Sequence, residues 1–273
     1  MSIVYEGLDA VDGSARFGFG GTKALASVSG PIEVRLAAEQ PSKATFEVLI
    51  RPLTNIPGTD SKSLASALRA LLSPSILLTR NPRTLIQLVV QSLTPKPTTR
   101  FQPALTAAFI NASTLALLNA GSIPMSGVVC AVSVGRVQSS ASDPAPLALL
   151  LDPTDEELAS TDASGCFAFI FAADFGEPKH INIVAPDVPG SKLVWTNWTA
   201  AAGTFDVAEL ARATELAKVG AERVWIDVKN SVRDMDRSVS APPRVVASEK
   251  VREETMESSE AEDDGSDDDQ MEI

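Results

Sequence analysis

A run of small apolar residues near the middle of the chain restricts its fold most strongly. Gly121 supplies a natural helix C-cap and Pro124 follows it, so the run predicts a helix over about residues 103–120. Because its side chains are short, this helix can pack closely against a β-sheet. Its small apolar residues are Ala104, Ala107, Ala108, Ala112, Ala116 and Ala120.

Strand patterns precede this helix. Residues 14–19 and 23–29 flank Gly20-Gly21, a dipeptide that suits the positive φ angles of a tight hairpin turn. Leucines and alanines at helical spacing predict an amphipathic helix over residues 61–72, which Pro74 ends. Further strands are predicted at residues 32–37, 45–51 and 84–93.

Strand patterns also follow the helix. A last helix is predicted from Asp206 to about residue 235, with Asp206 and Glu209 spaced as in a capping box. Strands and helices thus alternate, which indicates an α/β fold. The predicted strands between the two helices lie at residues 127–134, 147–151, 165–172, 181–184 and 193–198.

The negative charge is concentrated at the C-terminal end. Residues 253–273 hold eleven of the 35 acidic residues and no Lys or Arg, which leaves residues 1–252 with 24 acids against 23 bases. Such a segment buries too little apolar surface to offset its ordering entropy. We therefore expect a domain of residues 1–240 followed by a disordered acidic tail of residues 241–273. The near-neutral body also argues against strong independent binding of nucleic acid.

The sequence lacks the features that several classes of protein require. No apolar run reaches the roughly 20 residues that span a bilayer, and the first residues do not resemble a secretory signal. Cys130 and Cys166 lie in apolar strand patterns, where buried structural thiols are common. His180 is the only histidine, so neither a zinc site nor a histidine-based triad is predicted. We expect an intracellular protein without a metal or a cofactor.

Two segments suggest ligand binding by composition alone. Residues 18–22 are rich in glycine, but a phosphate loop needs a helix directly after it, so a hairpin is favoured. Residues 152–157 hold four acids after a predicted strand and could bind Mg²⁺, since hard cations prefer oxygen ligands. A solvated turn that starts at Asp152-Pro153 is the favoured interpretation of the second segment.

A series of short motifs resembles the RNase PH family. Each motif is weak alone, but their order over about residues 5–235 is specific, and the similarity is greatest to eukaryotic exosome ring subunits. The resemblance implies the RNase PH fold, an α/β arrangement of two βαβα-like halves of the ribosomal protein S5 domain 2-like type. The motifs lie at residues 12–16, 20–22, 26–31, 43–51, 56–58, 62–63, 81–84, 111–117, 119–125 and 151–154.

The resemblance also implies that the phosphate site has been lost. Active members of the family phosphorolyse RNA from its 3′ end, and an Arg at the start of the central helix holds the phosphate. In this chain the Arg position falls on Thr106, or on Leu105 if the register slips by one. Neither side chain can clamp phosphate through two hydrogen bonds as Arg does.

The family's acidic pattern is only partly retained. Asp152, Glu156 and Glu157 match its first acids, whereas Leu158 and Ser164 stand where the later Asp residues belong. Phosphorolysis requires that the charge of two anions be neutralised, and a Leu and a Thr do not provide this. We therefore expect a non-catalytic chain, and whether the three remaining acids hold a metal stays open.

The resemblance implies a structural subunit of the RNA exosome core ring. Such a subunit supports 3′-to-5′ RNA processing and degradation, including rRNA maturation, in the nucleus, nucleolus and cytoplasm. The implied partners are other RNase PH-like ring subunits, cap subunits, an associated nuclease and RNA in the central channel, but no membrane. The open alternatives are an active phosphate-dependent 3′-to-5′ exoribonuclease and a homo-oligomeric RNA-binding module.

Two further sets of residues are candidates for function. Lys62 follows the Pro57-Gly58 loop at the position of the family's pore-side loop and is the first candidate for RNA binding, ahead of Arg80 and Arg83. Serines that lie beside acids suit acid-directed kinases, and phosphorylation would deepen the charge of the tail. These candidate phosphorylation sites are Ser258, Ser259 and Ser266.

Overall fold

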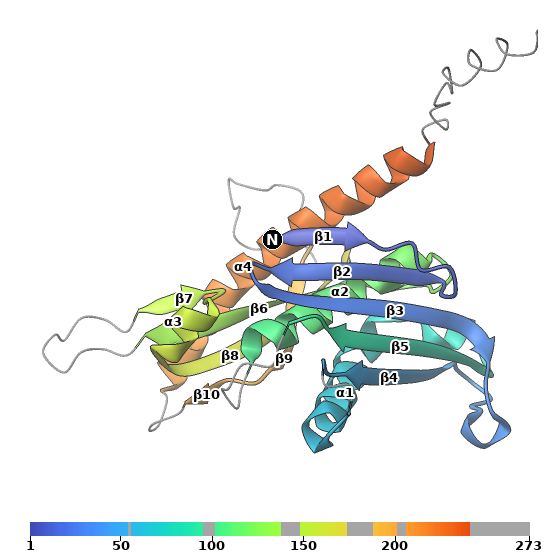
Figure 1. The fold of residues 1–273 in the computed structure, drawn as a ribbon, viewed down its shortest axis with the longest axis horizontal. Helices are drawn as coiled ribbons and strands as arrows, with labels where there is room; N and C mark the ends of the chain where they lie inside the picture. The colour runs from blue at the N-terminus through green and yellow to red at the C-terminus, as the bar shows by residue number, and fades with distance from the viewer. Residues whose placement is uncertain (54–55, 95–101, 138–147, 174–187, 201–205, 241–273) are drawn as a thin grey trace, which may run out of the picture. The chain divides into compact units, whose positions relative to one another are not determined.

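Two β-sheets and the helices that pack on them make up the described fold (Figure 1). The computed structural model describes residues 1–53, 56–94, 102–137, 148–173, 188–200 and 206–240, without the side chains of Asp155 and residues 236–240. Met1–Met235 form one compact unit, to which the following description applies.

The first sheet has the strand order β1-β2-β3-β5-β4. The hairpin of β2 and β3 is the predicted one, with Gly20 at a φ of 51° in its turn. β4 pairs in parallel with β5, and α1 is the crossover between them. The bounds are β1 Ser2–Tyr5, β2 Gly13–Phe19, β3 Thr22–Glu33, β4 Thr45–Arg51, α1 Thr59–Leu72 and β5 Thr84–Ser92.

The strand predicted at residues 32–37 is wrong beyond its second residue. β3 ends at Glu33, which pairs with the first residue of β5, Thr84. Leu36–Ala38 instead form a short 3-10 helix, η1. Because β5 offers no further residues to pair with, local β propensity alone does not extend the strand. Two other 3-10 helices, η2 (Ser73–Ser75) and η3 (Leu78–Arg80), lead from α1 to β5.

The second sheet is antiparallel throughout. Its order is β10-β8-β6-β7, and β9 also pairs with β8. The predicted strands around 127–134, 147–151, 165–172 and 193–198 are all present, whereas residues 181–184 lie outside the described part of the chain. The bounds are β6 Val128–Val137, β7 Leu149–Leu151, α3 Asp155–Ala159, β8 Thr161–Phe171, β9 Ser191–Thr196 and β10 Thr199–Ala200.

The central helix α2 (Pro103–Ala120) has the predicted bounds and contacts both sheets. Gly121 follows it in the left-handed conformation, with a φ of 62°, as a C-cap. The amide of Asn111 exchanges two hydrogen bonds of 2.8 Å with the backbone N–H and carbonyl of Ala131 on β6. By length and composition α2 could cross a membrane, but 78% of it is buried in the fold, as its small side chains allow.

The two cysteines are core residues of the second sheet. Cys130 on β6 and Cys166 on β8 are fully buried and free. Burial raises the pKa of both thiols above the ordinary value, so little thiolate forms near neutral pH. Their predicted placement in apolar strands is confirmed.

The last helix, α4 (Val207–Ser240), starts at the predicted place but without the predicted cap. The backbone carbonyl of Asp206 accepts hydrogen bonds from the N–H groups of Glu209 and Leu210, both at 3.1 Å. The Glu209 carboxylate binds Arg136 on β6 and does not close a capping box. The prediction is wrong because a charged partner from another element outcompetes the local backbone N–H.

Candidate functional sites

Asp152 follows β7 in the left-handed region, with a φ of 53° that Asp tolerates better than most residues. Its backbone N–H donates to the Ser133 carbonyl at 2.8 Å, and Ser133 Oγ lies 3.3 Å from Asp152 Oδ1. Burial raises the pKa of the Asp152 carboxyl above its usual value. The Ser133 hydrogen bond and the positive charge of the Met1 amino group oppose this shift in pKa, and the charge of Glu157 adds to it.

Asp152→Asn is expected to stabilise the fold near neutral pH. Because the folded-state pKa is raised, the stability that protonated Asp152 contributes is present below the unfolded pKa of about 3.9 and is lost as pH rises through the folded-state pKa. Asn is neutral at every pH, accepts the Ser133 hydrogen bond and tolerates the left-handed backbone.

Urea unfolding of both forms at pH 7 and at about pH 3 measures this effect. The variant should be the more stable form at pH 7 and match the wild type in acid. Equal stability at both pH values would contradict the raised pKa of Asp152.

Glu157 closes a capping box at the start of α3. Its Oε2 accepts hydrogen bonds from the backbone N–H of Thr154 at 2.8 Å and from Thr154 Oγ1 at 3.1 Å. The backbone N–H of Glu157 donates to Thr154 Oγ1 at 3.4 Å. The T-x-x-E spacing that signals this cap was present in the sequence and was missed.

The acids of residues 152–157 do not converge in the described structure. Glu157 is committed to the cap, and Glu156 is exposed. Among the side chains that are described, no group of three His, Cys, Asp or Glu residues is placed to hold a metal ion.

Thr106, at the position implied for the phosphate-binding Arg, lies in the first turn of α2. It is 7% exposed, and its Oγ1 donates to the Gln102 carbonyl at 3.0 Å. Asn111 bonds to Ala131 and Thr114 to Val129, so α2 runs antiparallel to β6 and the turn of Thr106 lies alongside the stretch near Ser133. A buried hydroxyl bonded to its own helix offers no positive charge to phosphate. Leu105, the alternative register, is partly buried against the core.

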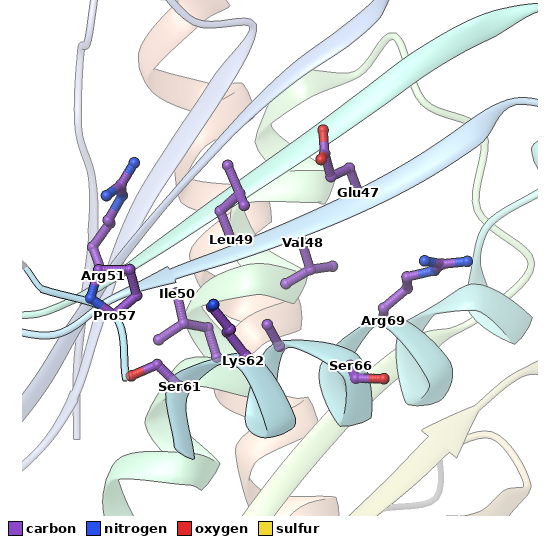
Figure 2. Close-up of a pocket in the computed structure, with 11 residues that line it drawn as sticks. Glu47, Val48, Leu49, Ile50, Arg51, Pro57, Ser61, Lys62, Ser66 and Arg69 are labelled. Carbon is purple, nitrogen blue, oxygen red and sulfur yellow. The ribbon is translucent and has the colours of Figure 1, made fainter. Parts of the chain in front are cut away.

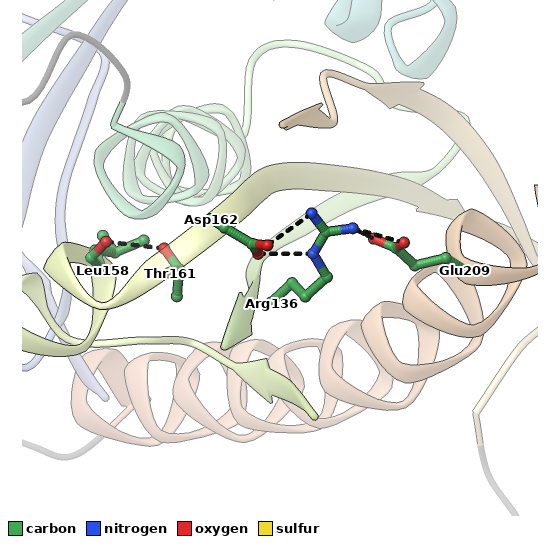
Figure 3. A network of polar contacts seen from close by, with 5 residues as sticks. All are labelled: Arg136, Leu158, Thr161, Asp162 and Glu209. Atoms are coloured by element: carbon green, nitrogen blue, oxygen red, sulfur yellow. Dashed lines mark hydrogen bonds and ion pairs between the residues drawn. The ribbon is translucent and has the colours of Figure 1, made fainter. Parts of the chain in front are cut away.

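The two other degenerate positions lie on α3 and β8. The carbonyl of Leu158 accepts a hydrogen bond from Thr161 Oγ1 at 2.8 Å (Figure 3). Ser164 pairs with Gly135 on β6 and with Thr199 on β10. Neither position provides a carboxylate, and the acid two residues before Ser164, Asp162, is bound to an arginine.

Arg136 is the centre of a buried network that sequence reasoning missed (Figure 3). Its Nε and Nη2 donate to the two oxygens of Asp162 on β8 at 2.7 and 2.9 Å. Its Nη1 donates to both oxygens of Glu209 on α4 at 2.9 and 2.7 Å. Arg136 is 5% exposed and Glu209 is 3% exposed, whereas the side chain of Asp162 is 22% exposed. The network therefore joins β6, β8 and α4 through a buried pair and a partly buried one. The sequence did contain a signal for this network: a single Arg within an apolar strand pattern, which needs a charged partner if it is buried.

Lys62 lies on a groove of about 360 Å³ between α1 and β4 (Figure 2). Arg51 and Arg69 lie on the same groove, so the structure brings three basic side chains to one surface. The side chains that line it are Glu47, Val48, Leu49, Ile50, Arg51, Pro57, Ser61, Lys62, Ala65, Ser66 and Arg69.

The other two candidates for RNA binding do not line this groove. Arg80 is the exposed last residue of η3. Arg83 lies before β5 with a φ of 62°, and its Nε is 3.4 Å from Glu39 Oε1. His180 and the three tail serines lie outside the described residues.

Comparison with known proteins shows which family the chain resembles. Residues 1–122 match the RNase PH model, described as the 3′ exoribonuclease family, domain 1. The exosome complex component RRP46 of Saccharomyces cerevisiae is 33% identical to the chain over 152 residues, and rrp46 of Schizosaccharomyces pombe is 36% identical over 126 residues. Over its first 122 residues the chain is similar to the RNase PH family, and the two yeast proteins are similar to about half of it. The alignments cover 55% and 46% of the chain, and the chain spans 65% and 53% of these curated relatives, less than two thirds of their length.

Solved structures share the RNase PH fold. The crystal structure of rice (Oryza sativa) Rrp46 matches with a TM-score of 0.66 and 23% identity, over 85% of this chain and 93% of that one. An archaeal exosome core matches with a TM-score of 0.59 and 15% identity, over 84% and 85%. A structure of the Archaeoglobus fulgidus exosome with RNA bound to its active site also has a TM-score of 0.59, with 14% identity over 83% and 87%. The predicted fold is confirmed.

Proposed function

We propose that the chain is a non-catalytic subunit of the RNA exosome core ring. The observation that carries the proposal is Thr106: where active relatives hold phosphate with an Arg, this chain has a buried hydroxyl bonded to Gln102. The absence of a carboxylate at Leu158 and Ser164 supports it. The similarity to two yeast proteins named as exosome components supports the assignment to this complex.

In this proposal the chain supports RNA processing and degradation through its contacts. It contributes part of a ring built with other RNase PH-like subunits, carries cap subunits and helps to form the channel that leads RNA to an associated nuclease. In this proposal the chain is located in the nucleus, the nucleolus and the cytoplasm, and it takes part in rRNA maturation.

Affinity purification tests the assignment to a complex. A tagged full-length chain, expressed at its natural level, should recover other RNase PH-like subunits in near-equal amounts, as quantitative mass spectrometry can measure. A matched protein tagged in the same way and unrelated to the family is the control. Recovery of this chain alone, as a homo-oligomer, would contradict the proposal and favour the RNA-binding module.

An active phosphate-dependent 3′-to-5′ exoribonuclease is the second candidate function. The retained Asp152, Glu156 and Glu157 favour it, because they match the first acids of the family's pattern. Against it, Glu157 is already held by Thr154 in the helix cap.

Lys62 is the first proposed RNA contact, followed by Arg80 and Arg83. In the assembled complex, Lys62→Glu should lower photo-crosslinking of single-stranded RNA to this chain severalfold, because it replaces an exposed cation by an anion near the phosphates. Arg212→Glu, an equal charge change at an exposed position on α4, is the control. If both variants crosslink alike, Lys62 does not contact RNA.

We propose that residues 241–273 form a disordered acidic tail and that phosphorylation increases its negative charge. Ser258, Ser259 and Ser266 lie among acids and would each gain about two negative charges. Intact-mass measurement of the native protein should show added phosphate that a Ser-to-Ala triple variant lacks. A native mass without phosphate would contradict this proposal.

A further inference from the structure

The groove between α1 and β4 runs along the edge of a strand. Five consecutive residues of β4, from Glu47 to Arg51, line it. Successive side chains of a strand point to opposite faces of its sheet, so all five can line one groove only if the groove follows the strand's edge. β4 is the last strand of the first sheet, and no described strand pairs with its outer edge.

This edge suits the addition of another strand. β4 pairs with β5 over all seven of its residues without a register shift, and it contains no proline. Alternate residues of such a strand direct their N–H and C=O groups outward, which makes the edge a template for an extended chain.

The opposite wall is one face of α1 with small residues. Ser61, Ala65 and Ser66 line the groove and leave space beside the strand, while Lys62 and Arg69 carry positive charge along the wall (Figure 2). Arg51 adds a third cation at the end of β4, and Glu47 is the single acid of the lining.

We infer that this groove binds an extended, acidic protein segment that adds to the β4 edge as a sixth strand. Backbone hydrogen bonds to β4 supply the affinity, and acidic side chains that face Lys62 and Arg69 supply the preference. The inference goes beyond the proposed function, since it concerns a protein partner, and it assigns Lys62 a role that competes with the RNA contact proposed for this side chain.

Two features favour a peptide over RNA as the occupant. A row of alternating backbone donors and acceptors matches another strand, not a sugar–phosphate chain. No aromatic residue lines the groove, so bases have nothing to stack on.

The test uses the full-length chain and a fluorescent eight-residue peptide of alternating valine and glutamate. Anisotropy should show binding that weakens with salt, and the same peptide with lysine in place of glutamate should bind at least about tenfold more weakly. Two further probes carry N-methyl groups on the odd or on the even residues. Because only alternate residues of the peptide face β4, one methylated peptide should lose binding and the other should retain it.

Matched variants locate the site. Ser66→Tyr fills the groove from an exposed position on α1 and should weaken binding about tenfold, the loss of one well-packed contact. Ser63→Tyr, at an exposed position of the same helix outside the groove lining, should leave binding unchanged. Hydrogen exchange should show that the peptide slows exchange of the amides of Thr45–Arg51.

Several results would overturn the inference. They are equal binding of both N-methylated peptides, equal affinity of the two Tyr variants, absence of binding by the acidic peptide, and protection of the β4 amides by an eight-nucleotide RNA in place of the peptide. None of them bears on the recovery of exosome subunits, so failure here is distinguishable from failure of the proposed function.

Discussion

Gly13→Ala should lower the free energy of unfolding by about 3 kcal/mol, at the upper end of what overpacking costs. A Cβ at Gly13 would lie 2.7 Å from the Cα of Ala120 and closer still to the carbonyl oxygen of Ala116. These are backbone atoms of α2, which cannot rotate away as the tip of a side chain can. The added methyl must therefore push the start of β2 away from the central helix.

Gly21→Ala is the matched control, because a Cβ at that position meets nothing within 4 Å. Chemical denaturation of both variants, followed by circular dichroism, measures the difference. A Gly13→Ala protein as stable as the control would show that β2 and α2 are not in this close contact. The result would also remove the physical reason for a glycine in the motif at residues 12–16.

Arg136→Met should destabilise the fold by about 3–5 kcal/mol, the usual cost of removing one partner of a buried ion pair. The substitution leaves the Glu209 carboxylate, 3% exposed, without its cationic partner. It also frees Asp162 and breaks the connection between β6, β8 and α4. Methionine preserves much of the side-chain volume, so the loss reports charge pairing more than a cavity.

Two further variants test whether the loss of stability comes from the buried charges. Arg223→Met removes an exposed cation 3.8 Å from Asp227 and should change stability by less than about 1 kcal/mol. The triple variant Arg136→Met, Asp162→Asn, Glu209→Leu removes all three charges and should recover a large part of the lost stability. If Arg136→Met and Arg223→Met unfold at the same denaturant concentration, the network does not stabilise the fold.

The regular elements could be predicted because their signals are local. The hairpin around Gly20, the helix that ends before Gly121 and the strand Thr45–Arg51 each follow from neighbouring residues. The helix and the strand have the predicted bounds, whereas the second strand of the hairpin, β3, runs on to Glu33, beyond the predicted end at residue 29. The strand predicted at 32–37 failed where its partner β5 ran out. Pairing depends on residues about 50 positions away, which local propensity does not report.

The candidate sites also divide into features that local sequence predicts and features that depend on distant residues. The positions of Thr106, Leu158 and Ser164 come from motif order, whereas the Arg136 network joins residues 26 and 73 positions apart. The cap predicted at Asp206 failed because Glu209 has a stronger partner in Arg136, and the cap at Thr154 was missed because its Glu157 was assigned to an acidic cluster. Competition between local and distant partners cannot be read from spacing alone.

Phosphate-dependent RNA cleavage is the measurement that tests the central claim most directly. The purified full-length chain is incubated with 3′-hydroxyl RNA, Mg²⁺ and inorganic phosphate, and released nucleoside diphosphates are measured. An Asp152→Asn protein prepared in parallel reports any contaminating nuclease. We predict the same background release from both proteins. Phosphate-dependent release by the wild-type chain that the Asp152→Asn protein lacks would contradict the account and establish an active exoribonuclease.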